Sequence, residues 1–272
     1  MTKTEGRFIW YELAASDVEK AKAFYTGVVG WSTADAPMSG GAVYTLFTAG
    51  GKPVAGLAPL QPDAQKSGVA SQWMGYVGVA DVDDAARQAE QLGGTIWLPP
   101  TDIPNVSRFS VISDPQRATL ALIKGREDHD EGPAQPNLPG HVVWRELIAS
   151  DWEKAFPFYN KLFGWQKATV TPGPGGIYQE FSAGGETVGG MFNQSDMPGF
   201  SVWLYYFGVP DLEASAKRVL ASGGAILYGP IIVPGVARII QCRDSQGAVF
   251  GLMDRLVHFA VGCYAPREPH KP

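Results

Sequence analysis

Residues 8–31 read FIWYELAASDVEKAKAFYTGVVGW, and residues 142–165 read VVWRELIASDWEKAFPFYNKLFGW. The two stretches align without a gap and share their Trp, Glu, Asp, Phe-Tyr and Gly-Trp positions. The same spacing relates YTLFTAGGKPVAGL (44–57) to YQEFSAGGETVGGM (178–191), and a spacing four residues shorter relates the later segments. A repeat that runs through nearly the whole chain indicates two homologous modules.

The limits of the modules follow from the repeat and from composition. We predict a first module at 1–125, a linker at 126–137, a second module at 138–255 and a C-terminal extension at 256–272. The linker is rich in charge, Pro and Gly and has no apolar periodicity, which is typical of a connecting segment. The extension has no counterpart in the first module.

Each module begins with a strand followed by a helix. Residues 8–14 are rich in β-forming side chains and predict a strand. The S-x-x-E pattern from Ser16 to Glu19 predicts a capping box, and apolar residues at 3–4 spacing predict a helix that ends at Gly30. In the second copy, Pro157 is expected to kink or loosen the helix.

Short strands and a second helix complete the module. We expect strands at 32–36, 43–48, 53–60, 73–79, 95–98, 107–113 and 119–124, with a helix at 81–92. The Pro-rich segments 98–106 and 228–236 are expected to be loops. Each module thus contains two βαβββ units, four in the chain. The predicted fold class is α+β: a curled mixed sheet in each module with helices outside, whose free face forms a cup suited to small molecules.

Composition narrows the class of partner. The chain has 272 residues, 45% hydrophobic, and a net charge of −5. It has no basic stripe that would bind nucleic acid, no apolar run of 18 residues that would span a membrane, and no signal-peptide pattern. Cys242 and Cys263 are too few for a disulfide scaffold or a four-Cys zinc site. We expect a cytoplasmic monomer or homodimer whose partner is a small molecule.

Several motifs together resemble a known family. They are ELAASDVEKAKAFY (12–25), the Gly-Trp ends of the first helices, and the closing strands SDPQRATLALIKG (113–125) and RDSQGAVFGLMDR (243–255). With these motifs the chain resembles the vicinal oxygen chelate (VOC) superfamily of glyoxalases, bleomycin resistance proteins and extradiol dioxygenases. It is most similar in pattern to tandem two-module bacterial members.

The resemblance implies a divalent metal in the cup, held by His, Glu or Gln from up to four strands. The residues at the matching positions are Trp10, Gly56, Met74 and Ala121 in the first module, and Trp144, Gly190, Leu204 and Gly251 in the second. None of these side chains suits a hard or borderline metal ion. The four histidines do not replace them, because three lie in the linker or tail and His141 is on the opposite strand face from Trp144. We expect no cofactor, and a divalent metal is the minority possibility.

Two carboxylates are the candidate catalytic residues. Glu12 shares a strand face with Trp10, and Glu146 shares one with Trp144. Burial beside indole would raise the pKa of each carboxyl group, which suits a general acid or base, or an anchor for a ligand. A purely structural alternative pairs each Glu with a repeated arginine. The candidate ligand-binding residues are Trp10, Glu12, Trp73, Tyr76, Arg108, Trp144, Glu146, Trp203, Tyr206 and Arg238.

Other chemically suggestive residues have structural interpretations. Asp114 and Asp244 begin D-P-Q and D-S-Q-G segments that predict tight turns between paired strands. Cys242 is interpreted as a small buried hydrophobe, because no His is placed to activate it.

Three functions remain open from the sequence. The first is metal-independent binding or sequestration of a small molecule. The alternative is a glyoxalase- or dioxygenase-like enzyme, a lyase, isomerase or oxygenase, that uses Glu12 or Glu146 or an atypical metal site. A third possibility is a role in assembly without any ligand.

Overall fold

The computed structural model describes residues 4–37, 43–66, 68–104, 106–124, 138–173, 176–194 and 201–255. The first sheet comprises β1 (Phe8–Ala15), β2 (Ser32–Pro37), β3 (Val43–Ala49), β4 (Lys52–Pro59), β5 (Gln72–Val79), β6 (Thr95–Ile103), β7 (Ser107–Ser113) and β8 (Thr119–Lys124). The second comprises β9 (Val142–Ala149), β10 (Gln166–Gly173), β11 (Gly176–Ala183), β12 (Glu186–Asn193), β13 (Val202–Gly208), β14 (Ala225–Val233), β15 (Ala237–Arg243) and β16 (Val249–Arg255). The helices are α1 (Val18–Val29), α2 (Pro62–Lys66), α3 (Val82–Gln91), α4 (Trp152–Phe163) and α5 (Leu212–Ala221).

The two sheets have the same topology. The strand order is β2-β3-β4-β1-β5-β8-β7-β6 in the first and β10-β11-β12-β9-β13-β16-β15-β14 in the second. In each sheet the first strand lies between a parallel and an antiparallel neighbour, as β1 lies between β4 and β5. The sheets are therefore mixed, and the predicted four βαβββ units in two homologous modules are confirmed.

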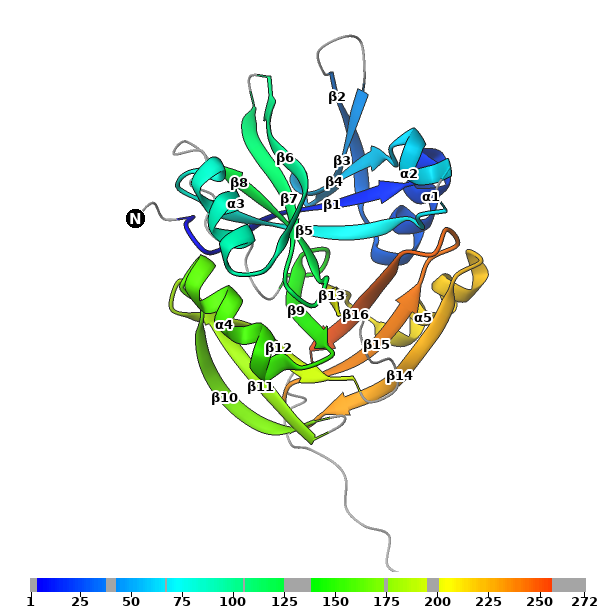
Figure 1. Ribbon diagram of the computed structural model, residues 1–272. Helices are drawn as coiled ribbons and strands as arrows, with labels where there is room; N and C mark the ends of the chain where they lie inside the picture. Colours follow the sequence, from blue (N-terminus) through cyan, green and yellow to red (C-terminus); the bar gives the residue numbers. More distant parts are fainter. Residues whose placement is uncertain are drawn as a thin grey trace, which may run out of the picture.

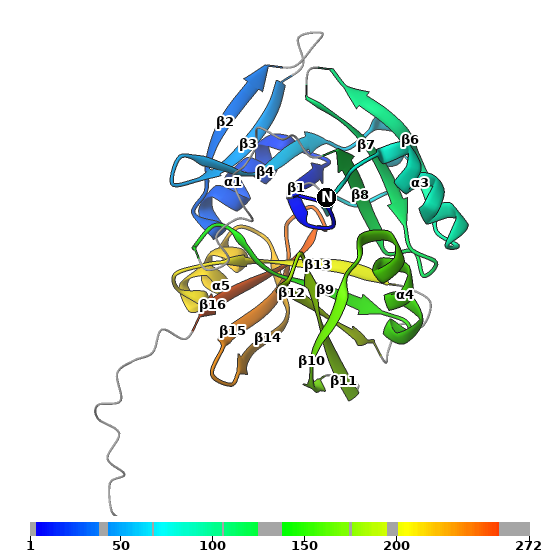
Figure 2. The same cartoon turned by 90° about the vertical axis from the view of Figure 1, so that its left-hand side faces the viewer.

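The sheets curl away from each other. Figures 1 and 2 show that β2–β3 and β6–β7 rise as two walls beside the central strands of the first sheet, and that β10–β11 and β14–β15 do the same in the second. Between the modules, α1 packs against α5 and α3 packs against α4. The helices therefore lie on the convex sides, and the two concave faces point in opposite directions.

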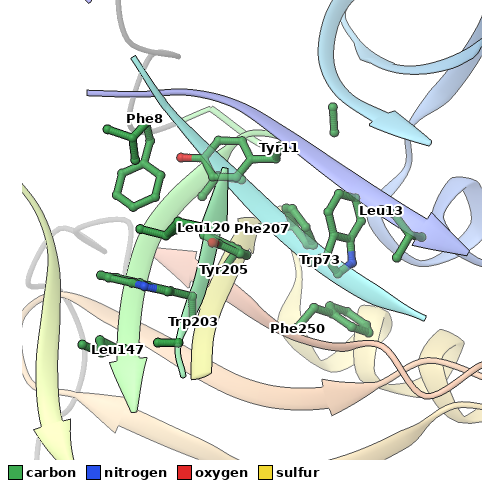
Figure 3. Close-up of a cluster of buried hydrophobic side chains, with 14 of the residues drawn as sticks. Phe8, Tyr11, Leu13, Trp73, Leu120, Leu147, Trp203, Tyr205, Phe207 and Phe250 are labelled. Atoms are coloured by element: carbon green, nitrogen blue, oxygen red, sulfur yellow. The ribbon is translucent and has the colours of Figure 1, made fainter. Parts of the chain in front are cut away.

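One aromatic core joins the modules. Its buried side chains come from both sheets and from α1, α3, α4 and α5, and Figure 3 shows part of it around Phe8, Tyr11, Trp73 and Trp203. The Trp31 and Phe207 rings, one from each module, have centroids 4.9 Å apart. Burial of this apolar surface is the main source of stability that the modules share.

Polar contacts at the junction are reciprocal. The Tyr25 hydroxyl of the first module donates to Asp244 Oδ2 of the second at 3.0 Å, and the Tyr159 hydroxyl of the second donates to Asp114 Oδ2 of the first at 2.9 Å. Each aspartate also accepts two backbone N–H groups within its own turn through Oδ1. The predicted Asp-initiated turns are therefore present, and they also contact the opposite module.

The start of helix α1 differs from the predicted capping box. The capping residue of α1 is Asp17, which accepts from the Lys20 backbone N–H, and not Ser16. Ser16 instead donates to Gln246 Oε1 of the second module at 2.7 Å, and the Asp17 backbone N–H donates to the same oxygen. A glutamine from the opposite module thus binds the start of the helix, a contact that local sequence does not reveal.

Two proline effects also differ from expectation. Helix α4 continues through Pro157, because five buried side chains around it hold the helix against the core. Strands β6 and β14 run into the Pro-rich segments that were expected to be loops. Both are edge strands with register shifts at the prolines, and an edge strand tolerates a missing N–H.

Two predicted segments, the linker 126–137 and the extension 256–272, lie outside the described residues. Among the helices that the structure does describe, none is long and apolar enough to cross a membrane.

Candidate functional site

The centre of the first concave face is Glu12 on β1. Its register partners are Gly56 on β4 and Met74 on β5. Trp10 lies two residues earlier on the same face and is paired with Tyr76. The structure thus brings together Trp10 and Glu12, which were expected to share a strand face, and the candidate ligand-binding residue Tyr76.

Hydrogen bonds link these residues into the first cluster, defined as Trp10, Tyr44, Glu12 and Tyr76. The Trp10 indole donates to the Tyr44 hydroxyl at 3.1 Å. Tyr44 in turn donates to Glu12 Oε2 at 2.5 Å, and Tyr76 donates to Glu12 Oε1 at 3.0 Å. Both carboxylate oxygens therefore have a phenolic donor.

The second module repeats the arrangement in the second cluster: Trp144, Tyr178, Glu146 and Tyr206. Trp144 donates to Tyr178 at 2.6 Å, and Tyr178 and Tyr206 donate to Glu146 at 3.0 and 2.8 Å. Here Gln241 adds an amide that donates to Glu146 at 3.3 Å and to Tyr206 at 2.9 Å.

Burial dominates the electrostatics of both clusters. Desolvation raises the pKa of Glu12 and of Glu146, and the hydrogen bonds from the tyrosines lower it by a smaller amount. Burial and the neighbouring carboxylate raise the pKa of Tyr44 and Tyr206, so the phenols remain donors at neutral pH. The carboxyl groups can thus hold or transfer a proton, or accept a hydrogen bond from a ligand.

The residues present do not fit the metal that the family resemblance implies. The four matching positions of the first module meet around the cluster but carry Trp10, Gly56, Met74 and Ala121. A Cβ at Gly56 would overlap the Tyr44 hydroxyl, so the phenol occupies the space of a side chain there. Over the described part of the chain, no three His, Cys, Asp or Glu side chains gather in a way that could hold a metal ion.

Four of the candidate ligand-binding residues lie elsewhere. Trp73 and Trp203 are 7% and 4% exposed and belong to the core between the modules. Their indoles donate to Tyr25 and Tyr159, because odd-numbered positions of β5 and β13 face the helices.

The repeated arginines are also away from the clusters. Arg108 forms ion pairs with Asp83 on α3 and with Asp102, and Arg238 pairs with Asp254 and Glu213. The structural alternative that paired each Glu with an arginine is therefore wrong. Both arginines point toward a helix on the convex side, whereas Glu12 and Glu146 point to the concave side.

Three residues that donate hydrogen bonds within or to the clusters were missed. Tyr44, Tyr178 and Gln241 supply hydrogen bonds to the carboxylates from β3, β11 and β15. A signal for the tyrosines was present, because both begin the aligned segments 44–57 and 178–191. Gln241 has no such signal, since its counterpart in the first module is Val111.

Comparisons with known proteins agree with the fold. The family model of the glyoxalase/bleomycin resistance protein/dioxygenase superfamily matches residues 7–122 and 139–252. The protein CFP32 of Mycobacterium tuberculosis, whose name proposes a glyoxylase, is 33% identical over 90% of this chain and 93% of its own. The anthracycline biosynthesis protein DauV of Streptomyces sp. (strain C5) is 28% identical over 90% of this chain and 92% of its own.

Solved structures are similar at lower identity. The Mn(II)-bound glyoxalase from Novosphingobium aromaticivorans has a TM-score of 0.58 and 17% identity, with 92% of this chain and 82% of that chain covered. The 2,2',3-trihydroxybiphenyl 1,2-dioxygenase from Sphingomonas wittichii strain RW1 has a TM-score of 0.58 and 13% identity, with 91% and 89% covered. At these identities the likeness concerns the fold.

Proposed function

The chain belongs to the glyoxalase/bleomycin resistance protein/dioxygenase superfamily, and from that premise we propose that it binds or sequesters a small organic molecule without a metal. One observation carries the proposal. In both modules a Trp, a Gly and other non-ligating residues stand at the positions that the resemblance assigns to metal ligands. The nearest carboxylate is already engaged by two tyrosine hydroxyls.

The first concave face combines apolar and polar groups in a way that suits a ligand. Trp10, Met74 and Phe109 are partly exposed and apolar, and Glu12 offers an acceptor between them. Ligand sites are mostly apolar with a few placed polar groups. Since relatives from two Streptomyces strains are named as anthracycline biosynthesis proteins, polycyclic aromatic molecules are the first class to test.

Native mass spectrometry of the untagged chain, together with elemental analysis, tests the proposal. We expect no stoichiometric metal, a saturable complex with an anthracycline or another polycyclic aromatic, and no turnover of the ligand. A stoichiometric metal would contradict metal-independent binding. The same spectrum counts subunits and distinguishes the monomer from the homodimer; two modules in one chain supply the pairing that a single module would need from a second copy, which is compatible with a monomer.

The alternative is a glyoxalase- or dioxygenase-like enzyme. Its support is that burial raises the pKa of Glu146 and of Glu12, which suits a carboxyl group that exchanges a proton with a substrate. In that case Glu12→Gln or Glu146→Gln should abolish turnover of a bound substrate while the circular dichroism spectrum stays unchanged. Retained turnover in both variants would eliminate a proton-transfer role for these residues.

A further inference from the structure

The two concave faces differ, although their clusters match. We infer that the first module carries the ligand site, and that this site takes a neutral or cationic aromatic molecule with a hydroxyl or amino donor, while the second concave face is more closely packed around its glutamate. This inference rests on the proposed binding function and adds to it the location and the ligand chemistry.

The two concave faces differ in how closely their side chains are packed. The second face has its own cluster of buried residues: Val143, Leu204, Tyr206, Ala237 and Met253, with Trp144, Ile148 and Ile239 packed against them. Glu146 in this face is only 6% exposed. At equivalent positions of the first module, Glu12, Met74 and Ile123 all remain partly exposed.

One substitution between the modules adds a further difference. Phe192 on β12 is paired with Tyr178, and the two rings stack with centroids 5.9 Å apart. Its counterpart in the first module is Ala58, which has no ring to place against Tyr44. The second face thus has an aromatic side chain at a position where the first has only a methyl group.

The two concave faces also differ in the hydrogen bonds that their glutamates accept. In the second cluster Gln241 donates to Glu146 in addition to the two tyrosines. Its counterpart in the first module is the apolar Val111, so Glu12 accepts from Tyr44 and Tyr76 without an added amide. A carboxylate has about four acceptor sites, and the partly exposed Glu12 can accept a further hydrogen bond from a ligand.

The charges on the first concave face favour one class of ligand. On β1, β3, β5, β7 and β8, and over Gly56 and Ala58 of β4, the described positions that share the face of Glu12 carry no Lys, Arg or His. An anionic ligand would meet an acceptor and no cation, at a cost that low dielectric increases. A donor on a neutral or cationic aromatic ring would instead satisfy Glu12 while the ring contacts Trp10 and Met74.

Three matched probes test the ligand class: 2-naphthol, 2-methoxynaphthalene and 2-naphthoate. They share one ring system and differ in the donor and in charge. We expect saturable binding of 2-naphthol, binding at least about tenfold weaker for the methoxy compound that lacks the donor, and no saturable binding of the anion. Equal affinity of naphthol and naphthoate, or no binding of naphthol by the full-length chain, would overturn the ligand class.

Methionine methyl NMR tests the location without any destabilising variant. Met74 lies in the first concave face and Met253 in the second, and conservative Leu variants assign their signals. We expect 2-naphthol to shift the Met74 methyl signal and to leave that of Met253 in place. A shift of Met253 alone, or equal shifts of both, would overturn the assignment to the first module.

Exchanging the residues that distinguish the faces provides a second test. Ala58→Phe should abolish the Met74 response, whereas the matched change Phe192→Ala should leave that response intact; circular dichroism confirms that each variant is folded. The opposite pattern would overturn the assignment. Naphthol binding through Met253 would leave the proposed binding function standing, whereas a stoichiometric metal in the native mass spectrum would remove that function whatever the methyl signals show.

Discussion

Tyr25→Phe is a sharp test of how the modules are joined. Tyr25 is fully buried, and its hydroxyl donates to Asp244 Oδ2 at 3.0 Å and accepts from the Trp73 indole at 2.8 Å. The variant removes one oxygen atom and keeps the ring in its aromatic contacts. Any loss of stability therefore reports these two hydrogen bonds, one of which connects the modules.

The expected cost follows from the partners that are left behind. A hydrogen bond to a charged group contributes about 1.5–3 kcal/mol, and an unpaired buried donor such as the Trp73 indole costs about 1–3 kcal/mol. Asp244 keeps its backbone donors from Gln246 and Ala248, which limits the sum. We expect a loss of about 2–4 kcal/mol, which lowers the melting temperature by roughly 5–15 °C for a chain of this size.

Urea denaturation and calorimetry measure this loss. Both modules should unfold in one transition, because a single aromatic core spans them. Tyr159→Phe is the matched variant on the other side of the junction and should cost a similar amount. Tyr228→Phe is the control, since Tyr228 is 50% exposed and should stay within about 0.5 kcal/mol of the wild type. A Tyr25→Phe loss no larger than that of the control would refute the reasoning.

Three further predictions concern the clusters and the junction. Gly56→Ala should displace Tyr44 from the first cluster and cost about 1–3 kcal/mol in urea denaturation, whereas Gly27→Ala in the exposed, open part of α1 should stabilise by up to about 1 kcal/mol; equal effects would argue against the overlap. Because burial raises the folded-state pKa of Glu146 above its ordinary 4.5, the wild type should lose stability relative to Glu146→Gln as the pH rises from 4.5 to 8. Urea titrations across that range would contradict this if the wild type gained instead. Gln246→Ala should cost about 0.5–2 kcal/mol by freeing the Asp17 N–H at the start of α1, and an unchanged unfolding midpoint would argue against that contact.

Sequence reasoning predicted some residues of the site and missed others. Strand periodicity correctly placed Trp10 and Glu12 on one face, and the repeat placed Trp144 and Glu146 in the same way. Trp73 and Trp203 were counted among the aromatic residues that could line a pocket, but they face the core, since each lies one residue from a position on the concave face, Met74 or Leu204. Tyr44 and Tyr178 were overlooked, since they reach the carboxylates from strands 32 residues away in the chain.

The sequence by itself determined the repeated architecture. Internal similarity, turn residues and apolar periodicity are local properties, and they were sufficient for two modules of two βαβββ units each. The residues at the four positions that the family resemblance assigns to metal ligands could also be read from the sequence.

Only the tertiary structure decided how the repeats work together. The pairing of Arg108 with α3, the contact of Gln246 with the start of α1, and the hydrogen bond from Tyr25 to Asp244 all join residues that are distant in sequence. The difference between the concave faces also depends on tertiary structure, because the effect of Ala58 or Phe192 depends on the tyrosine ring, Tyr44 or Tyr178, on the neighbouring strand. Such contacts depend on the relative placement of whole strands and helices, which local propensity does not specify.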